Sequence, residues 1–126
     1  MRVPILKQKN YLIASVQAAL SDSDLETLRD ELTAQVGQHR SLGVIIDVTA
    51  LDVLDSFAVR TLRSMAQMVQ LRGATTVIVG IQPDVAFAMV QLGLKLGTIA
   101  TALDLEEGLG LLDRLMLAKR GPAHAS

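Results

Sequence analysis

The chain has 126 residues, of which 50% are hydrophobic, and its net charge at pH 7 is −1. This length forms one domain with a single core, and that core must be aliphatic because the chain has only one tyrosine and two phenylalanines. So few rings and so little charge argue against nucleic-acid binding, which uses stacking aromatic side chains or a basic surface. The lack of cysteine excludes thiol catalysis, disulfides and cysteine–zinc sites.

The two ends of the chain indicate its compartment and its domain boundary. Residues 1–10 contain charged side chains and no apolar stretch before a cleavage site. No apolar run reaches the ~18 residues of a membrane span. We therefore expect a cytoplasmic protein without a membrane partner. The expected domain covers residues 1–118, and residues 119–126, which contain Gly121 and Pro122, are expected to form a flexible tail.

The first expected elements are strands at residues 4–7 and 11–16, with a turn at 9–10 that predicts an antiparallel hairpin. A helix follows, because Ser23 and Glu26 have the spacing of a capping box. It is expected to end near Gly37. Its buried face is formed by Leu25, Leu28, Leu32 and Val36.

The middle of the chain predicts two buried strands joined by a helix. Residues 44–48 and 75–80 are apolar and β-branched, which is typical of parallel strands covered on both faces. The helix between them is expected over 56–72 and ends at Gly73. Its predicted buried side comprises Ala58, Leu62, Met65 and Val69. Its polar side comprises Arg60, Arg63, Gln67 and Gln70 and is either a solvated face or a docking face.

The last third of the chain predicts a short helix, an edge strand and a final helix. Pro83 suits the first turn of a helix that ends near Gly93. That helix is apolar nearly all round, so it is either buried or in contact with another subunit; a core position is favoured for Phe87, with an exposed anchor as the alternative. An edge strand is expected over 98–101. The final helix is expected to start with a capping box of Asp104 and Glu107 and to bury Leu105, Leu109, Leu112 and Met116.

Alternation of strands and helices predicts an α/β fold: one mixed, mostly parallel sheet of four or five strands with an antiparallel N-terminal hairpin, packed by about four helices. Catalytic chemistry is not expected in this fold. The two histidines are His39, expected in a surface loop, and His124 in the tail, so a metal site or a catalytic triad has no residues to form it. No phosphate-binding loop with a lysine is present either. We expect no enzyme activity, cofactor or metal.

One segment is unusual, because three aspartates at 47, 52 and 55 lie between a buried strand and a helix that begins at Ser56. The structural interpretation is that the Ser56 hydroxyl caps the helix and that Asp55 complements the positive end of its dipole. The functional interpretation is that Ser56 is phosphorylated, since a helix N-terminus accommodates phosphate. Spacing alone favours the structural interpretation.

Several segments together resemble the STAS domain family. They are Val44 to Asp47, the Asp55-Ser56-Phe57 step, Gly80 to Pro83, Gln91 to Gly93 and Thr101 to Leu109. Within the family the chain looks most similar to the short scaffold protein of stressosomes. Many simple anti-sigma-factor antagonists have glycine after the phosphorylated serine, whereas Phe57 and Ala58 follow here, which favours the stressosome branch.

The resemblance implies a non-enzymatic scaffold that assembles with itself and with longer STAS paralogues bearing an N-terminal sensory domain. It would hold a switch-type serine kinase until that kinase phosphorylates Ser56, and the freed kinase would start a partner-switching cascade ending at a sigma factor or another output. Alternatives are a simple antagonist that binds an anti-sigma-factor kinase, and a module that binds a nucleotide or a lipid. Ser15, Ser21 and Thr49 stay open as further phosphorylation sites. The residues expected to bind partners are Asp55, Phe57, Arg60, Arg63, Gln67, Phe87 and Val90.

Overall fold

The computed structural model describes residues 2–120 of the chain. In chain order the elements are β1 (Ile5–Gln8), β2 (Tyr11–Ser15), α1 (Asp22–His39), β3 (Gly43–Asp47), α2 (Ser56–Leu71), β4 (Thr75–Val79), α3 (Pro83–Gln91), β5 (Ala100–Ala102) and α4 (Leu105–Arg120). This order is the one that the sequence predicts, including the short edge strand. β5 lies two residues later than its expected start at position 98, because Ala100 is the residue that pairs with Val77 of β4.

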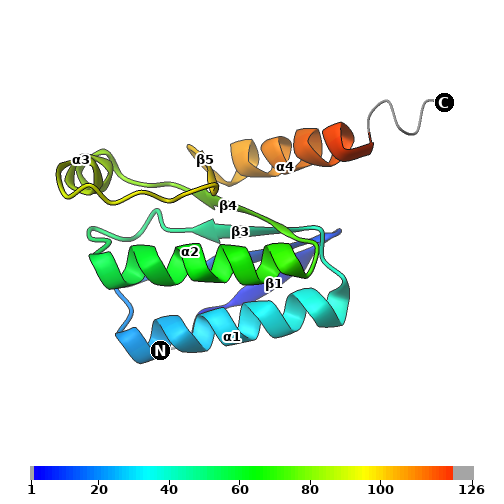
Figure 1. Cartoon of the computed structure of the whole chain (residues 1–126), viewed down its shortest axis with the longest axis horizontal. Coiled ribbons are helices and arrows are strands. Elements are labelled where there is room, and N and C mark those ends of the chain that lie inside the picture. The colour runs from blue at the N-terminus through cyan, green and yellow to red at the C-terminus, as the bar shows by residue number, and fades with distance from the viewer. Residues whose placement is uncertain (1, 121–126) are drawn as a thin grey trace.

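The five strands form one sheet in the order β1-β2-β3-β4-β5. β1 pairs antiparallel with β2, and the other neighbours are parallel, so the predicted mixed and mostly parallel sheet is confirmed. Each pair of neighbouring parallel strands is connected by a helix. The right-handed rule for such connections therefore places α1 and α2 on the same face of the sheet, and Figure 1 shows these two helices side by side there.

Both faces of the central strand β3 are covered. Val44 and Ile46 are fully buried in the cluster that includes α1 and α2, and Ile45 is fully buried in the cluster on the α4 side. Side chains alternate between the faces of a strand, so an unbroken apolar run requires cover on both sides. α3 packs through Val85 and Met89 against the α1–α2 side. The carboxyl ends of β3 and β4 consequently meet the starts of α2 and α3 at one end of the molecule.

The ends of α1 differ from the expected ones. Ser21, and not Ser23, is the N-cap: its hydroxyl accepts from the Asp24 backbone N–H at 3.1 Å, and the Asp24 carboxylate accepts from the Ser21 N–H at 3.2 Å. An aspartate therefore fulfils the role expected of Glu26. The helix continues past Gly37 until Arg40 adopts a left-handed conformation with φ of 51°. His39 accordingly lies in the last turn of α1 and not in a loop.

α4 begins with the capping pair that the sequence predicts. It begins after Asp104, whose carboxylate accepts from the Glu107 backbone N–H at 2.9 Å, while the Glu107 side chain accepts from the Leu103 N–H at 3.2 Å. The helix runs through Lys119 to Arg120, and the expected division into a domain of residues 1–118 and a flexible tail stays a prediction. The remaining tail residues and His124 lie outside the described residues. A Cβ at Gly108 would stand 2.6 Å from Val79 Cγ1, so glycine permits the close packing of α4 on the sheet.

Substitution of Leu112 should show how much α4 contributes to stability. Leu112 is fully buried between α4 and the sheet, and Leu112→Ala should lower the free energy of unfolding by about 2–5 kcal/mol. The matched control is Leu117→Ala on the same helix, because Leu117 is 65% exposed and its loss should cost less than about 0.5 kcal/mol. Urea denaturation of both variants measures the difference. Equal values would contradict the described packing of α4.

Candidate functional site

The segment of residues 48–55, here called the β3–α2 segment, crosses the end of the sheet and leads into α2. Three of its aliphatic side chains are buried, with exposed fractions of 2% for Val48, 7% for Leu51 and 7% for Leu54. Asp52 and Val53 are exposed. The segment has no regular secondary structure, but its buried side chains pack into the core and so hold its backbone in place.

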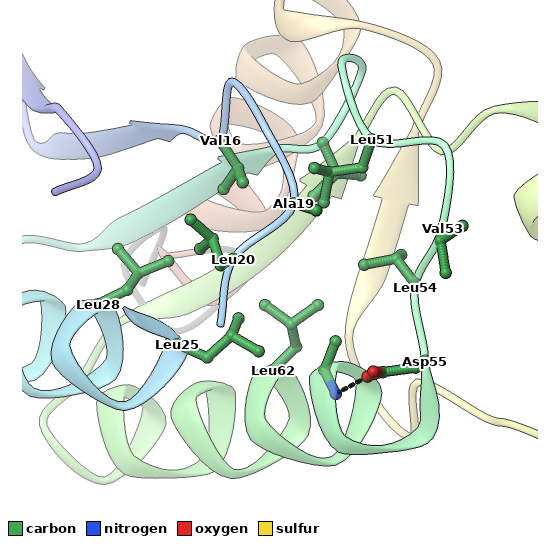
Figure 2. Close-up of a pocket in the computed structure, with 12 residues that line it drawn as sticks. Val16, Ala19, Leu20, Leu25, Leu28, Leu51, Val53, Leu54, Asp55 and Leu62 are labelled. Atoms are coloured by element: carbon green, nitrogen blue, oxygen red, sulfur yellow. Dashed lines mark hydrogen bonds between the residues drawn. The ribbon is translucent and has the colours of Figure 1, made fainter. Parts of the chain in front are cut away.

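Asp55, and not Ser56, is the N-cap of α2. Its Oδ1 accepts a hydrogen bond of 2.8 Å from the Ala58 backbone N–H, and its φ and ψ of −82° and 177° are extended. Figure 2 shows this contact at the first turn of α2. Ser56 is therefore the first helical residue, and its side chain is exposed. The expected capping role of Ser56 is wrong, because the preceding aspartate already satisfies the free N–H group.

Ser56 lies on the same face of α2 as the predicted polar stripe. Positions 56, 60, 63 and 67 follow at steps of four, three and four, which keeps them on one side of a helix. Arg60, Arg63 and Gln67 are all exposed, and Gln70 continues the stripe. The opposite face is buried as predicted, through Ala58, Leu62, Met65 and Val69. The structure thus places the serine at the N-terminal end of an exposed polar surface.

Phe57 has a different position from the stripe. It is partly buried and packs against the core cluster on the α1–α2 side. Phe57 therefore steadies the first turn of α2 on the core. Its expected role in partner binding remains a prediction for its exposed part.

The third helix exposes its largest apolar side chains. Phe87 is 66% and Val90 is 79% exposed, whereas Val85 and Met89 are buried. The core position favoured for Phe87 is therefore wrong, because residues 85 and 89 are one helical turn apart and face the core, leaving 87 on the other side. Ala86 and Ile81 line a shallow hollow beside Leu103, which is 80% exposed. Periodicity did not single out Leu103, because it stands alone between β5 and α4.

An apolar pocket of about 90 Å³ lies beneath the β3–α2 segment. Figure 2 shows side chains around it from the β2–α1 connection, from α1 and from the start of α2. Asp55 is the one charged residue among its lining residues, and no lysine or arginine reaches it. A nucleotide site needs convergent polar donors for phosphate, and this pocket does not provide them.

The described residues hold no cluster of three or more histidine, cysteine, aspartate or glutamate side chains that could bind a metal ion. Within the same residues, no helix has the length and apolar character needed to cross a membrane.

Two substitutions distinguish Asp55 from Ser56 as the cap of α2. Asp55→Ala should lower the free energy of unfolding by about 1 kcal/mol, because it leaves the Ala58 N–H without its side-chain acceptor. Ser56→Ala should change it by less than about 0.5 kcal/mol, since the serine is an exposed helical residue. Thermal and urea denaturation of both variants provide the measurement. The reverse order of the two losses would show that Ser56 is the cap.

Comparisons with known proteins agree with this architecture. The family model of the STAS domain matches residues 2–107. RsbT co-antagonist protein RsbRA of Bacillus subtilis (strain 168) is 26% identical over 107 residues, which are 85% of this chain and 38% of RsbRA. The chain thus spans less than half of that relative.

Two solved structures are similar over most of this chain. A variant of RsbS from Moorella thermoacetica, in which glutamate replaces one serine, is 35% identical and covers 90% of this chain and 97% of its own, with a TM-score of 0.78. A chain from the structure describing the molecular architecture of the stressosome is 32% identical with a TM-score of 0.73, covering 90% of this chain and 98% of its own. The chain belongs to the STAS domain family, and it is similar to the co-antagonist RsbRA, to RsbS and to a chain of the stressosome.

Proposed function

We propose that this protein is a scaffold of a stressosome-type complex that holds a switch-type serine kinase and releases it when the kinase phosphorylates Ser56. The released kinase would then act in a partner-switching pathway that ends at a sigma factor or another output. The observation that carries the proposal is the exposed Ser56 side chain at the first position of α2, next to an aspartate that already caps the helix. Ser56 therefore does not cap α2, and its exposed hydroxyl is accessible to a kinase.

A phosphate at Ser56 changes the charge of this end without disturbing the fold. Phosphorylation adds a charge of about −1.5 to −2 and three acceptor oxygens, and the N–H groups at a helix start favour that charge. Asp52 and Asp55 are exposed close by in the sequence, so the modified segment becomes a concentrated anionic surface. A kinase docked against neutral Ser56 would meet repulsion and a newly hydrated group. The exposed Arg60, Arg63 and Gln67 would supply the rest of the docking face.

Assembly is proposed to use the exposed apolar residues of α3. Phe87 and Val90 are large, apolar and more than half exposed, and such side chains on one surface mark a site of association. The similarity to a stressosome chain and to part of the longer RsbRA supports partners of two kinds, further copies of this chain and longer STAS paralogues.

The direct test incubates the protein with the kinase and ATP, maps the modified peptide by mass spectrometry and measures kinase binding. We expect phosphate on Ser56 and loss of the kinase. Ser56→Ala should retain the kinase in the presence of ATP, and Ser56→Asp should weaken binding in part, because it carries one charge and fewer acceptors than phosphoserine. Phosphate at another residue, together with normal release from Ser56→Ala, would contradict the proposal. If the captured kinase is an anti-sigma factor, the simpler antagonist role is the correct one.

Substitution of the α3 residues tests the assembly surface. Phe87→Asp and Val90→Asp should abolish large assemblies while leaving a folded domain, because both side chains are exposed and exposed changes alter stability by only about 0.5 kcal/mol. Ser64→Asp, at an exposed position of α2, adds the same single negative charge and is the control. Light scattering reports the assembly and circular dichroism the fold. Assemblies of wild-type size in both α3 variants would remove this surface from the proposal.

A further inference from the structure

We propose that Gln82 is a positioning residue that holds the β3–α2 segment, and with it Ser56, against the start of α3. Gln82 is the N-cap residue of α3, yet its side chain makes no capping hydrogen bond. Its Nε2 instead donates to the backbone carbonyl of Thr49, 33 residues earlier in the chain, at 2.8 Å. The Gln82 side chain therefore does not cap α3. It connects the start of α3 to the β3–α2 segment.

Thr49 is itself fixed on its other side. Both its backbone N–H and its hydroxyl donate to Oδ1 of Asp47, at 2.9 and 2.6 Å. The backbone carbonyl of Asp47 accepts from the Val16 N–H at 2.9 Å. The Asp47 side chain therefore orients the turn in which the Thr49 carbonyl faces Gln82, and the position of this acceptor is set by the end of β3.

The backbone of the β4–α3 connection also lies directly against Thr49. Gly80 has a φ of 82°, and a Cβ added there would overlap the Thr49 hydroxyl. Only glycine combines this left-handed conformation with such a close approach. The β3–α2 segment and the β4–α3 connection therefore meet at one place, here called the Thr49 contact. It is formed by Asp47, Thr49, Gly80 and Gln82.

The Thr49 contact joins the two surfaces of the proposed function, on which this inference rests. The apolar side chains of the β3–α2 segment fasten it to the α1–α2 side of the core, whereas Gln82 fastens it to α3. A subunit that binds α3 and shifts its first turn would therefore move the segment presenting Ser56. Coupling between two binding sites is reciprocal, so kinase binding at Ser56 would change the affinity of association through α3 by the same factor as association changes kinase binding.

Hydrogen exchange on the purified chain tests the contact without a kinase. In Gln82→Glu, which keeps the side-chain shape but removes the donor, the hydrogen-bonded amides of Thr49 and Leu51 should exchange about fivefold faster, the change expected for one lost hydrogen bond. Gln82→Ala is the second variant. Gln91→Glu is the matched control, because Gln91 is an exposed glutamine on the same helix. The amides of β3 and β4 should keep their wild-type rates in every variant. Wild-type exchange of the Thr49 and Leu51 amides in both Gln82 variants would overturn the inference.

Kinetics of Ser56 phosphorylation provide the second readout. The Gln82 variants should lower kcat/KM for the kinase about fivefold at a temperature at which every variant is fully folded, and Gln91→Glu should not. Faster exchange with an unchanged kcat/KM would overturn the positioning role. If the wild-type chain is not phosphorylated at Ser56 while the exchange result holds, the proposed function fails and the Thr49 contact stands.

Discussion

The hydrogen bond from the Ala58 N–H to the Asp55 carboxylate determines what Ser56 can do. At 2.8 Å it closes the first turn of α2 from outside the helix, so the serine hydroxyl is not needed to satisfy a free backbone group. The buried Leu51 and Leu54 hold the segment that places Asp55 at the cap. The phosphorylation proposed for Ser56 would therefore leave the cap of α2 in place. It would also put the phosphate at the positive end of the helix dipole.

The switch proposed at Ser56 requires a domain that stays rigid while its surface charge changes, and the separate positions of Asp55 and Ser56 meet this requirement. The core beneath α2 is built from aliphatic side chains that do not change with phosphorylation, and the exposed stripe from Arg60 to Gln67 shares a helix face with the serine. A change of charge at one end of that stripe alters the surface that a partner meets while the packing stays the same. α3 presents a separate apolar surface whose start touches the same segment through Thr49 and Gln82.

The sequence was sufficient for the order of elements because its inner strands are strongly apolar and the spacing of apolar residues in α1 and α2 is helical. Val44 to Val48 could only be a doubly covered strand, and the spacing of Leu25 to Val36 assigned the buried face of α1. Helix ends were harder to predict. Ser21 and Ser23 both have an acidic residue three positions later, and local spacing does not show which side chain reaches the free N–H groups. Tertiary packing decides that choice.

The candidate site was predicted to a different extent. Ser56 and the polar stripe followed from the resemblance and from helical periodicity, and the structure places them on one face. The exposure of Phe87 did not follow, because a helix that is apolar on all sides gives no periodic signal for the face it buries. The contact of Gln82 with Thr49 joins positions 33 residues apart, and no pattern within one element could have indicated it.

The central claim is that phosphate on Ser56 expels a docked kinase through charge and hydration at the start of α2. The most direct measurement is a calorimetric titration of the kinase with the unmodified and the Ser56-phosphorylated chain at about 0.05 M and about 0.5 M salt. The account predicts at least about tenfold weaker binding of the phosphorylated chain at low salt, and a smaller ratio at high salt because exposed charges are screened. Equal or tighter binding of the phosphorylated chain would contradict it.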